Sequence, residues 1–275
     1  MKQYLDLARD ILDNGKERLN ERTNKKTLSL FSRSVRFDLQ EGFPLVTTKK
    51  VSFHNIVFEN LWFLRGDTNI KFLTDNGVQI WNKWATEDGE IGPMYGKQMV
   101  SWDGCVNQVS NLIQELKTDP HSRRHVMSTW NVTELPEPGF STQENVGCGL
   151  MALAPCHGVA TQFYVDDGKL SCLTFQRSAD VPIGLPYNIA GYALLTHMIA
   201  HQCDLEVDEL IYHLGDCHIY KDQIDGIREQ LTREPLPLPS LSFARKPDSI
   251  FDYAYKDFIL ENYQHHATIK IPVSV

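Results

Sequence analysis

Hydrophobic and polar positions follow helical spacing over much of the chain. The stretch 53–64 is apolar nearly all round, which is typical of a deeply buried helix. Residues 106–116 are amphipathic instead, and Asp119-Pro120 follows them as a stop signal. The pattern therefore predicts helices over residues 4–14, 53–64 and 106–116 and from Pro186 to Cys203.

Other segments alternate apolar and polar residues, the pattern of half-buried strands. Strands are predicted around residues 35–39, 125–130, 162–165, 170–176 and 215–220. Asp166-Asp167-Gly168 separates two of them and is a strong hairpin signal. No repeat or linker interrupts the irregular order of helices and strands, so we expect one α+β domain over residues 1–275. The long loop-like stretch 136–149 is expected to be a functional or mobile insertion.

Composition narrows the class of protein. Hydrophobic residues make up 42% of the chain and charged residues 23%, as in ordinary globular proteins, and the formal net charge is -8. That charge argues against general binding to nucleic acid or anionic membranes, so a phosphate-bearing ligand needs a local cluster of basic residues. The six cysteines have no metal-ligand spacing, and no secretory signal or membrane span is present. Reduced thiols and a cytoplasmic location are expected.

Cys156-His157, which precede a predicted strand, are the sharpest candidates for chemistry. A cysteine acts as a nucleophile in its thiolate form, which needs a neighbouring positive charge or good donors. For an isolated Cys-His pair a structural role is the more common explanation. A cysteine hydrolase is disfavoured because neighbouring residues of one strand point to opposite faces, which places His157 poorly as a base.

Several polar residues stand where a ligand could use them. Arg22, Arg123-Arg124 and Arg177-Ser178 border predicted strands, and several guanidinium groups together could hold a phosphate, although for any one of them alone a surface ion pair is the more common explanation. His218 and Tyr220 are two apart on one predicted strand, so they share a face and could hold one hydroxyl. Asn188 lies at a predicted helix start, where it could cap the helix or read the edge of a base.

These motifs, in their order and spacing, resemble the thymidylate synthase family. The resemblance rests on Pro155-Cys156-His157, Gln176-Arg177-Ser178-x-Asp180, Gly184 to Ala190 (GLPYNIA) and Gly215-Asp216-x-His218-x-Tyr220. Segments 43–49, 61–69, 92–96 and 122–124 extend it over nearly the whole chain. It implies a mixed sheet packed with helices, with the sheet at the interface of a homodimer.

The resemblance also implies a reaction, in which dUMP is methylated to dTMP by 5,10-methylenetetrahydrofolate as cosubstrate, without a metal. Cys156 would attack the pyrimidine, and Glu59, Tyr95, Arg177 and Asp180 would assist. The nucleotide would be bound by Arg22, Gln176, Arg177, Ser178, Asn188, His218 and Tyr220, with Arg123 and Arg124 supplied by the other subunit. The folate would be bound by Trp81, Trp84, Leu153, Asp180, Gly184 and Tyr187, and Ser274 belongs to a C-terminal tail that would close over both ligands.

Some positions depart from the family's usual pattern, mostly in the folate half of the site. Asn24-Lys25-Lys26 replace a glycine-containing turn, Val181-Pro182-Ile183 replace an aromatic-leucine step, and Ser52 stands where a basic side chain is usual. Two alternatives therefore stay open: a hydroxymethylase that adds water instead of hydride, and an inactive protein of the same fold that binds a nucleotide or RNA. Asn188 favours uracil as the base, and Trp81 together with the tail favours hydride transfer.

Overall fold

The computed structural model describes residues 1–21 and 23–274. Its strands are β1 (Lys16–Asn20), β2 (Lys25–Asp38), β3 (Val126–Met127), β4 (Ala160–Asp166), β5 (Lys169–Asp180), β6 (Glu206–Tyr220), β7 (Ser240–Phe243) and β8 (Phe258–Glu261). Its helices are α1 (Lys2–Asn14), α2 (Phe53–Arg65), α3 (Lys71–Asp75), α4 (Tyr95–Ser101), α5 (Gln108–Thr118), α6 (Thr142–Gly147), α7 (Gly184–Gln202) and α8 (Ile224–Leu231). Three 3-10 turns, η1 (Lys221–Gln223), η2 (Ile250–Asp252) and η3 (Tyr255–Asp257), complete the described elements.

Six strands form one mixed sheet in the order β1-β2-β6-β5-β4-β3, in which only β5 and β6 run parallel. The register aligns residues of alternating burial across it. Phe37, Leu210, Cys172 and Phe163 lie side by side and are all buried. The neighbouring row, which includes Leu173, is more accessible. The sheet therefore has one core face and one outer face.

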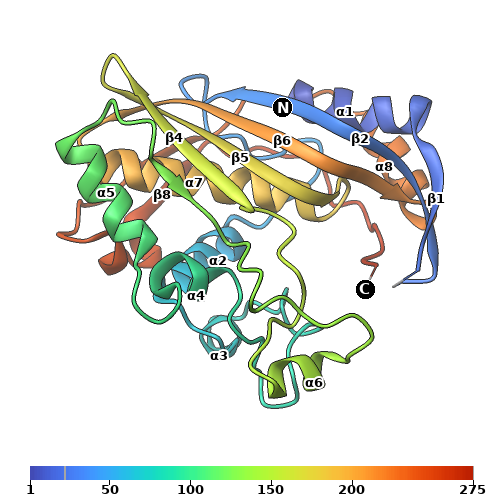
Figure 1. Ribbon diagram of the computed structural model, residues 1–275. Coiled ribbons are helices and arrows are strands. Elements are labelled where there is room, and N and C mark those ends of the chain that lie inside the picture. Colours follow the sequence, from blue (N-terminus) through green and yellow to red (C-terminus); the bar gives the residue numbers. More distant parts are fainter. Residues whose placement is uncertain (22, 275) are drawn as a thin grey trace.

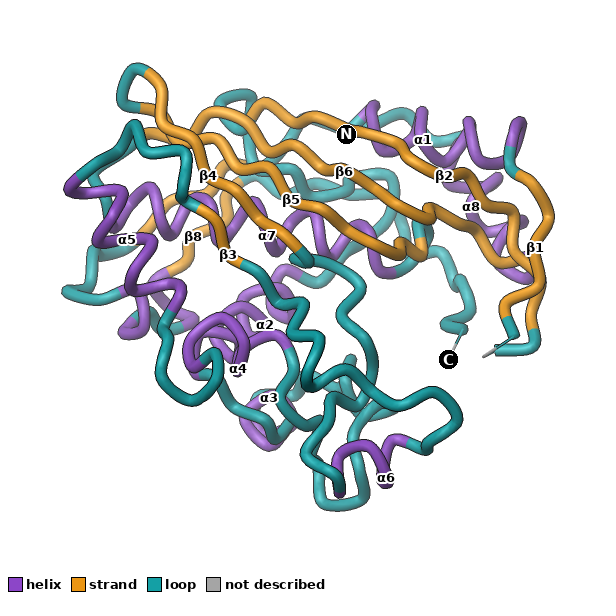
Figure 2. Tube along the Cα trace, in the orientation of Figure 1, coloured by secondary structure: helices purple, strands orange, loops and turns teal. Residues whose placement is uncertain are grey.

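In the described parts of the chain, the long helices α1 and α7 cover the core face of this sheet. α1 packs on β2, and α7 packs on β5 and β6, while α2 packs on the far side of α7 (Figure 1). The outer face carries large exposed side chains, with Tyr164 59% and Phe175 37% exposed. Figure 2 shows the strands of this sheet across the upper part of the molecule, with α7 behind them and α2 below them. A sheet of this kind leaves an apolar surface open to a partner.

Most predicted elements are confirmed, because the apolar periodicity that predicted them is also what buries them. All four long helices are found, and the hairpin joins β4 to β5 as expected. The predicted strand 125–130 is too long, since only Val126–Met127 pairs with β4 at the edge of the sheet. Residues 136–149 are not wholly a loop: α6 begins after Ser141, whose side chain accepts a hydrogen bond from the Glu144 amide. No helix in the described ranges is long and apolar enough to cross a membrane.

Candidate active site

Cys156 lies in the loop just before β4, where residues from two other elements hold it. Its amide donates a 2.8 Å hydrogen bond to the Tyr95 hydroxyl, at the start of α4, and its carbonyl accepts one from the Ser178 amide. Arg177 donates from Nε to the Pro155 carbonyl and from Nη2 to the Ala154 carbonyl, and each hydrogen bond is 3.2 Å long. The guanidinium group is thereby fixed beside the loop that carries the thiol. Arg177 and Ser178 lie within β5, which runs beyond the predicted strand 170–176 that they were expected to border.

His157 is buried, and its contacts do not suit it to act as a base for the Cys156 thiol. Its ring stacks on Tyr95 with centroids 4.2 Å apart, and its Nδ1 makes a 3.2 Å hydrogen bond with the Tyr192 hydroxyl. Burial lowers the pKa of His157 to about 3, so the ring is neutral at physiological pH. The sequence prediction of a poorly placed base is consistent with this, although the reason differs, because Cys156 and His157 are not part of a strand.

Gly158 lets the loop that carries Cys156 pass close to α7, and its replacement tests how tightly the loop is held. Its φ is +63°, and a Cβ there would lie 2.0 Å from the Tyr192 hydroxyl oxygen. We expect Gly158→Ala to lower the free energy of unfolding by about 2–4 kcal/mol, because strain and a steric clash add. Gly168→Ala is the matched control, with φ +73° and no atom within 4 Å. Gly168→Ala should lower the free energy of unfolding, measured in urea, by only about 1 kcal/mol. Equal losses for the two variants would show that the Tyr192 side chain moves aside to accept the added methyl group.

Asn188 lies in the first turns of α7, not at its cap, and an amide on the sheet orients it. Gln176, 1% exposed on β5, donates from Nε2 to Asn188 Oδ1 over 3.1 Å and to the Ser178 carbonyl over 3.1 Å. The Gln176 Oε1 atom is buried and has no hydrogen-bond partner among the described residues. An unpaired buried acceptor of this kind is costly unless a ligand or water satisfies it. The Gln176–Asn188 pair is therefore placed to form hydrogen bonds with a polar group of a ligand.

The parallel pairing of β5 with β6 brings the other end of the site into position. Asp180 aligns with His218, which shares a face with Tyr220; the two rings meet edge to face at 5.2 Å. His218 Nδ1 lies 2.9 Å from an oxygen of Asp216, and the Tyr220 hydroxyl accepts from Asn20 Nδ2 over 3.1 Å. The two side chains are thus held by their neighbours and lie close together, as the sequence predicted.

Glu59 and the indoles of Trp81 and Trp84 form a third group. Trp81 Nε1 donates a 2.7 Å hydrogen bond to Glu59 Oε1, and the Trp84 ring lies 5.9 Å from that of Trp81. Burial raises the pKa of Glu59 to about 7, and the hydrogen bond from Trp81 acts in the opposite direction. The carboxyl is thus poised to exchange a proton near neutral pH. A small buried pocket joins Glu59 to Tyr95, His157, Tyr187 and Asn188.

Asp180 is linked to the C-terminal tail through Gln223, which also donates to the Pro272 carbonyl. Its carboxylate accepts from Gln223 Nε2 over 3.0 Å and from the Ile183 amide over 3.1 Å. Burial raises its pKa, while Gln223 and His218 lower it in part. Leu153 is half-buried against the core, and Gly184 opens α7, where an added Cβ would lie 3.6 Å from Asn188 Oδ1.

Some predicted site residues are not brought to Cys156. Arg123 and Arg124 are exposed in the turn before β3, and neither side chain makes a hydrogen bond or ion pair with another described residue. Arg22, predicted to bind phosphate, lies outside the described residues, as does Val275 at the end of the tail. Ser274 is described and is 8% exposed.

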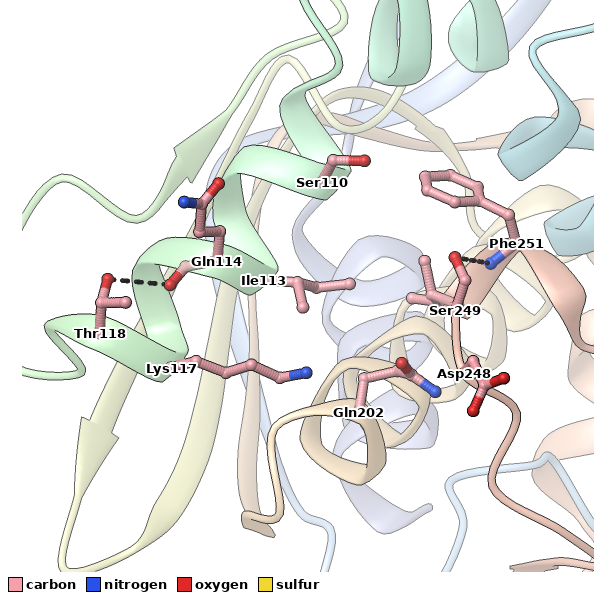
Figure 3. Close-up of a pocket in the computed structure, with 10 residues that line it drawn as sticks. Ser110, Ile113, Gln114, Lys117, Thr118, Gln202, Asp248, Ser249 and Phe251 are labelled. Atoms are coloured by element: carbon pink, nitrogen blue, oxygen red, sulfur yellow. Dashed lines mark hydrogen bonds between the residues drawn. The ribbon is translucent and has the colours of Figure 1, made fainter.

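A larger hollow lies elsewhere and contains none of the predicted site residues. It has a volume of about 350 Å³ and lies between α5, the end of α7 and η2. Figure 3 shows Lys117, Gln202 and Phe251 around it. Since it is wide and open and lacks the Cys156 constellation, its size does not make it the reaction site.

Sequence reasoning missed three residues that support the site. The Trp130 ring lies 5.4 Å from the Arg177 guanidinium carbon, in a cation–π arrangement. Gln223 binds both Asp180 and the Pro272 carbonyl, and Lys49 is buried and donates to the Pro182 carbonyl. An isolated tryptophan, glutamine or lysine has no local pattern that could have identified it.

Comparison with known proteins agrees with the resemblance in the sequence. Residues 2–275 match the model of the family described as thymidylate synthase. Thymidylate synthases of Francisella philomiragia subsp. philomiragia and of Francisella tularensis subsp. holarctica are each 54% identical to this chain over 276 residues, with both chains covered completely. Similarity of this extent leaves no part of the chain outside the match.

Proposed function

We infer that this chain, which belongs to the thymidylate synthase family, methylates dUMP to dTMP through a covalent adduct at Cys156. The reaction follows from the family, and the residue roles are our proposal. The observation that carries it is the fixed group around Cys156, in which Tyr95 and Ser178 hold its backbone and Arg177 is bound beside it.

Cys156 is proposed to add through Sγ to C6 of the uracil ring. The electron pair of the C5–C6 bond then moves toward the C4 carbonyl, so that C5 becomes an enolate carbon able to attack. Arg177 supports this step because a neighbouring cation favours the thiolate. C5 takes the one-carbon unit of the folate cosubstrate and loses its proton to the polar groups of the pocket, and the bond from the methylene to the folate nitrogen breaks. Hydride from the tetrahydrofolate then reduces the exocyclic methylene while the Cys156 thiolate is expelled from C6, which releases dTMP and dihydrofolate. Glu59, with a pKa of about 7, and the Tyr95 hydroxyl are the proposed carriers of protons there.

The base and the sugar are proposed to be read by groups that their neighbours already orient. Asn188 Oδ1 is engaged by Gln176, so its Nδ2 is available to donate to the O4 carbonyl of uracil. The unpaired Gln176 Oε1 provides a further acceptor. His218 and Tyr220 are proposed to hold the deoxyribose hydroxyl. Ser178 and Arg177, with Arg22, are proposed to bind the phosphate.

The folate half of the site fits a flat aromatic ring. Trp81, Trp84 and Tyr187 provide apolar surfaces beside the Glu59 pocket, and Asp180 offers a buried carboxyl as a hydrogen-bond partner. Leu153 and Gly184 are proposed to complete the wall. The tail that contains Ser274 is proposed to close over the ligands and exclude water during hydride transfer.

A homodimer is proposed to complete the phosphate site. Arg177 continues the outward row of Leu173 and Phe175 on β5, so it faces the uncovered side of the sheet. Arg123 and Arg124 are exposed, and their side chains make no hydrogen bond or ion pair with the described residues, which suits a role in the site of a second copy. A two-fold interface on this sheet face would bury Tyr164 and Phe175 as well.

Mixing two inactive variants tests this sharing. Equal amounts of Cys156→Ser and Arg123→Ala subunits, once exchanged, should recover about a quarter of wild-type activity, because half of the dimers are hybrids with one intact site. Activity is measured after exchange has been verified by native mass spectrometry. If the exchanged mixture is no more active than the separate variants, the sites are not shared.

The pH dependence of turnover should report Glu59. The carboxyl is neutral below its pKa of about 7 and charged above it, so kcat should change near that pH and the change should disappear in Glu59→Gln. Trp81→Phe removes the donor that favours the charged form, and the apparent pKa should therefore rise. Trp84→Phe keeps that hydrogen bond and serves as the control. An unchanged apparent pKa in Trp81→Phe would contradict the assignment.

Two further features are proposed. Residues 136–149 are proposed to be an insertion in the family's domain, because Asn145 binds the Glu137 amide and so closes this segment on itself. A cytoplasmic location is proposed from the cysteine usage, since none of the six cysteines forms a disulfide.

The reaction is tested by identifying both products. Purified protein is incubated with dUMP and methylenetetrahydrofolate. The mass of the nucleotide product is measured by mass spectrometry, and the folate product is identified by its absorbance. We expect dTMP together with dihydrofolate. Hydroxymethylated nucleotide with tetrahydrofolate would show that the protein is a hydroxymethylase. Unchanged substrates would favour an inactive binding protein of this fold.

A further inference from the structure

The C-terminal tail is bound to the rest of the molecule at several described points. Ile269 is buried, and Ile271 packs so closely on α8 that a Cβ on Gly226 would lie 2.6 Å from its side chain. Further along, Gln223 of η1 donates to the Pro272 carbonyl over 3.1 Å. In Figure 1 the described tail ends near the side of the β1–β2 hairpin where Asn20 pairs with Lys25. The tail is therefore packed down as far as Pro272 before it meets β2.

One ammonium group joins the last part of the tail to this strand pair. Lys25, the first residue of β2, donates from Nζ to Ser274 Oγ over 3.1 Å and to Asp222 Oδ2 over 2.6 Å. Ser274 is 8% exposed although Val273 beside it is 43% exposed. The alternation indicates that Ser274 is turned inward, toward β2. Lys25 thus bridges three segments: β2, η1 and the tail.

The position of Lys25 ties the tail to the nucleotide end of the site. Lys25 pairs with Asn20 across the β1–β2 turn, and Asn20 donates to the Tyr220 hydroxyl. Asn24, with φ 50°, adopts the left-handed conformation that a glycine would otherwise supply. The Asn24-Lys25-Lys26 sequence at this turn thus places a lysine within reach of the tail.

We propose that Lys25 is a positioning residue that latches the C-terminal tail in its closed position through Ser274, with Asp222 holding the ammonium group in place. The proposal rests on the proposed function of the tail as a lid. An ammonium group has three donors, so it can bind the carboxylate and the hydroxyl together. A plain surface ion pair between Lys25 and Asp222 would leave Ser274 and the tail unaffected.

The neighbouring lysine provides a matched control. Lys26 points to the other side of β2, where it binds Glu17 over 2.7 Å. Lys25→Met and Lys26→Met each remove one ammonium group from the same strand end. Only the first breaks a contact with the tail. Lys25→Arg keeps the charge and the donors and should rescue the loss.

Two measurements separate the latch from a purely structural role. We expect Lys25→Met to raise the KM for methylenetetrahydrofolate by about two- to fivefold, the range of an exposed ion pair, and to raise the KM for dUMP by less. Trimming of the tail by a carboxypeptidase should be faster by a similar factor. Lys26→Met should match the wild type in both, and adding Ser274→Ala to Lys25→Met should have little further effect.

The latch would be overturned if Lys25→Met and Lys26→Met gave the same KM values and the same trimming rates. It would also be overturned if Lys25→Met raised the KM for dUMP as much as the KM for the folate and left trimming unchanged. Failure of Lys25→Arg to restore the wild-type values would overturn it as well. The trimming measurement needs no turnover. If the wild-type protein makes no dTMP, the proposed function fails while the trimming rates still decide whether Lys25 holds the tail.

Discussion

Replacing Cys156 by serine is expected to abolish turnover while leaving the binding of dUMP measurable. A serine hydroxyl keeps the shape of the side chain but is far harder to ionise, so it cannot replace the thiolate as a nucleophile. The backbone contacts of this position, to the Tyr95 hydroxyl and the Ser178 amide, do not depend on the sulfur atom. The loop should therefore keep its form.

We expect kcat to fall at least about a thousandfold, as for the loss of other enzyme nucleophiles, with the Kd for dUMP within about threefold of the wild type. Steady-state kinetics and isothermal titration measure the two quantities. Cys105→Ser is the matched control, because Cys105 is exposed and lies outside the site. If the activity of Cys156→Ser were within tenfold of the wild type, Cys156 would not be the nucleophile.

Changing Asn188 to aspartate should have the second-largest effect, on the choice of base. The Gln176 amide donates to Asn188 Oδ1, and a carboxylate at position 188 would accept that hydrogen bond equally well. It would no longer donate to the O4 carbonyl of uracil, but it could accept from the 4-amino group of cytosine. The change therefore exchanges a donor for an acceptor without disturbing the contact that orients the residue.

We expect kcat/KM for dUMP to fall about a hundredfold or more, since a site that leaves a buried polar group unpaired discriminates strongly. Turnover of deoxycytidylate should rise in parallel. Both are measured by competition between the two nucleotides, with Asn111→Asp on the exposed face of α5 as the control. Unchanged selectivity would mean that another residue reads the base.

The fold could be predicted from the sequence wherever burial follows a local period. The helix around Phe58 and the alternation of Val35 and Phe37 were recognisable because the core selects apolar residues at those intervals. The strand at 125–130 was predicted too long because it lies at the sheet edge, where only two residues find partners. The capping box at Ser141 lay in a stretch without apolar periodicity, so α6 was missed.

Site residues could be predicted only as far as motifs reach. The thiol of Cys156 and the pair His218 and Tyr220 stand in short patterns that the family shares. The bond between Gln176 and Asn188, and the approach of Lys25 to Ser274, depend on contacts between distant parts of the chain. No local pattern encodes such contacts, which are set by strand register and by the packing of the tail.

The covalent adduct at Cys156 is the most direct test of the account. We would mix excess enzyme with dUMP and methylenetetrahydrofolate, quench at increasing times, digest the protein and weigh the peptide that contains Cys156. We expect this peptide to gain the mass of the nucleotide before dTMP appears and to lose it afterwards. If dTMP accumulates while the nucleotide is found on another cysteine, or on none at any time, Cys156 is not the nucleophile.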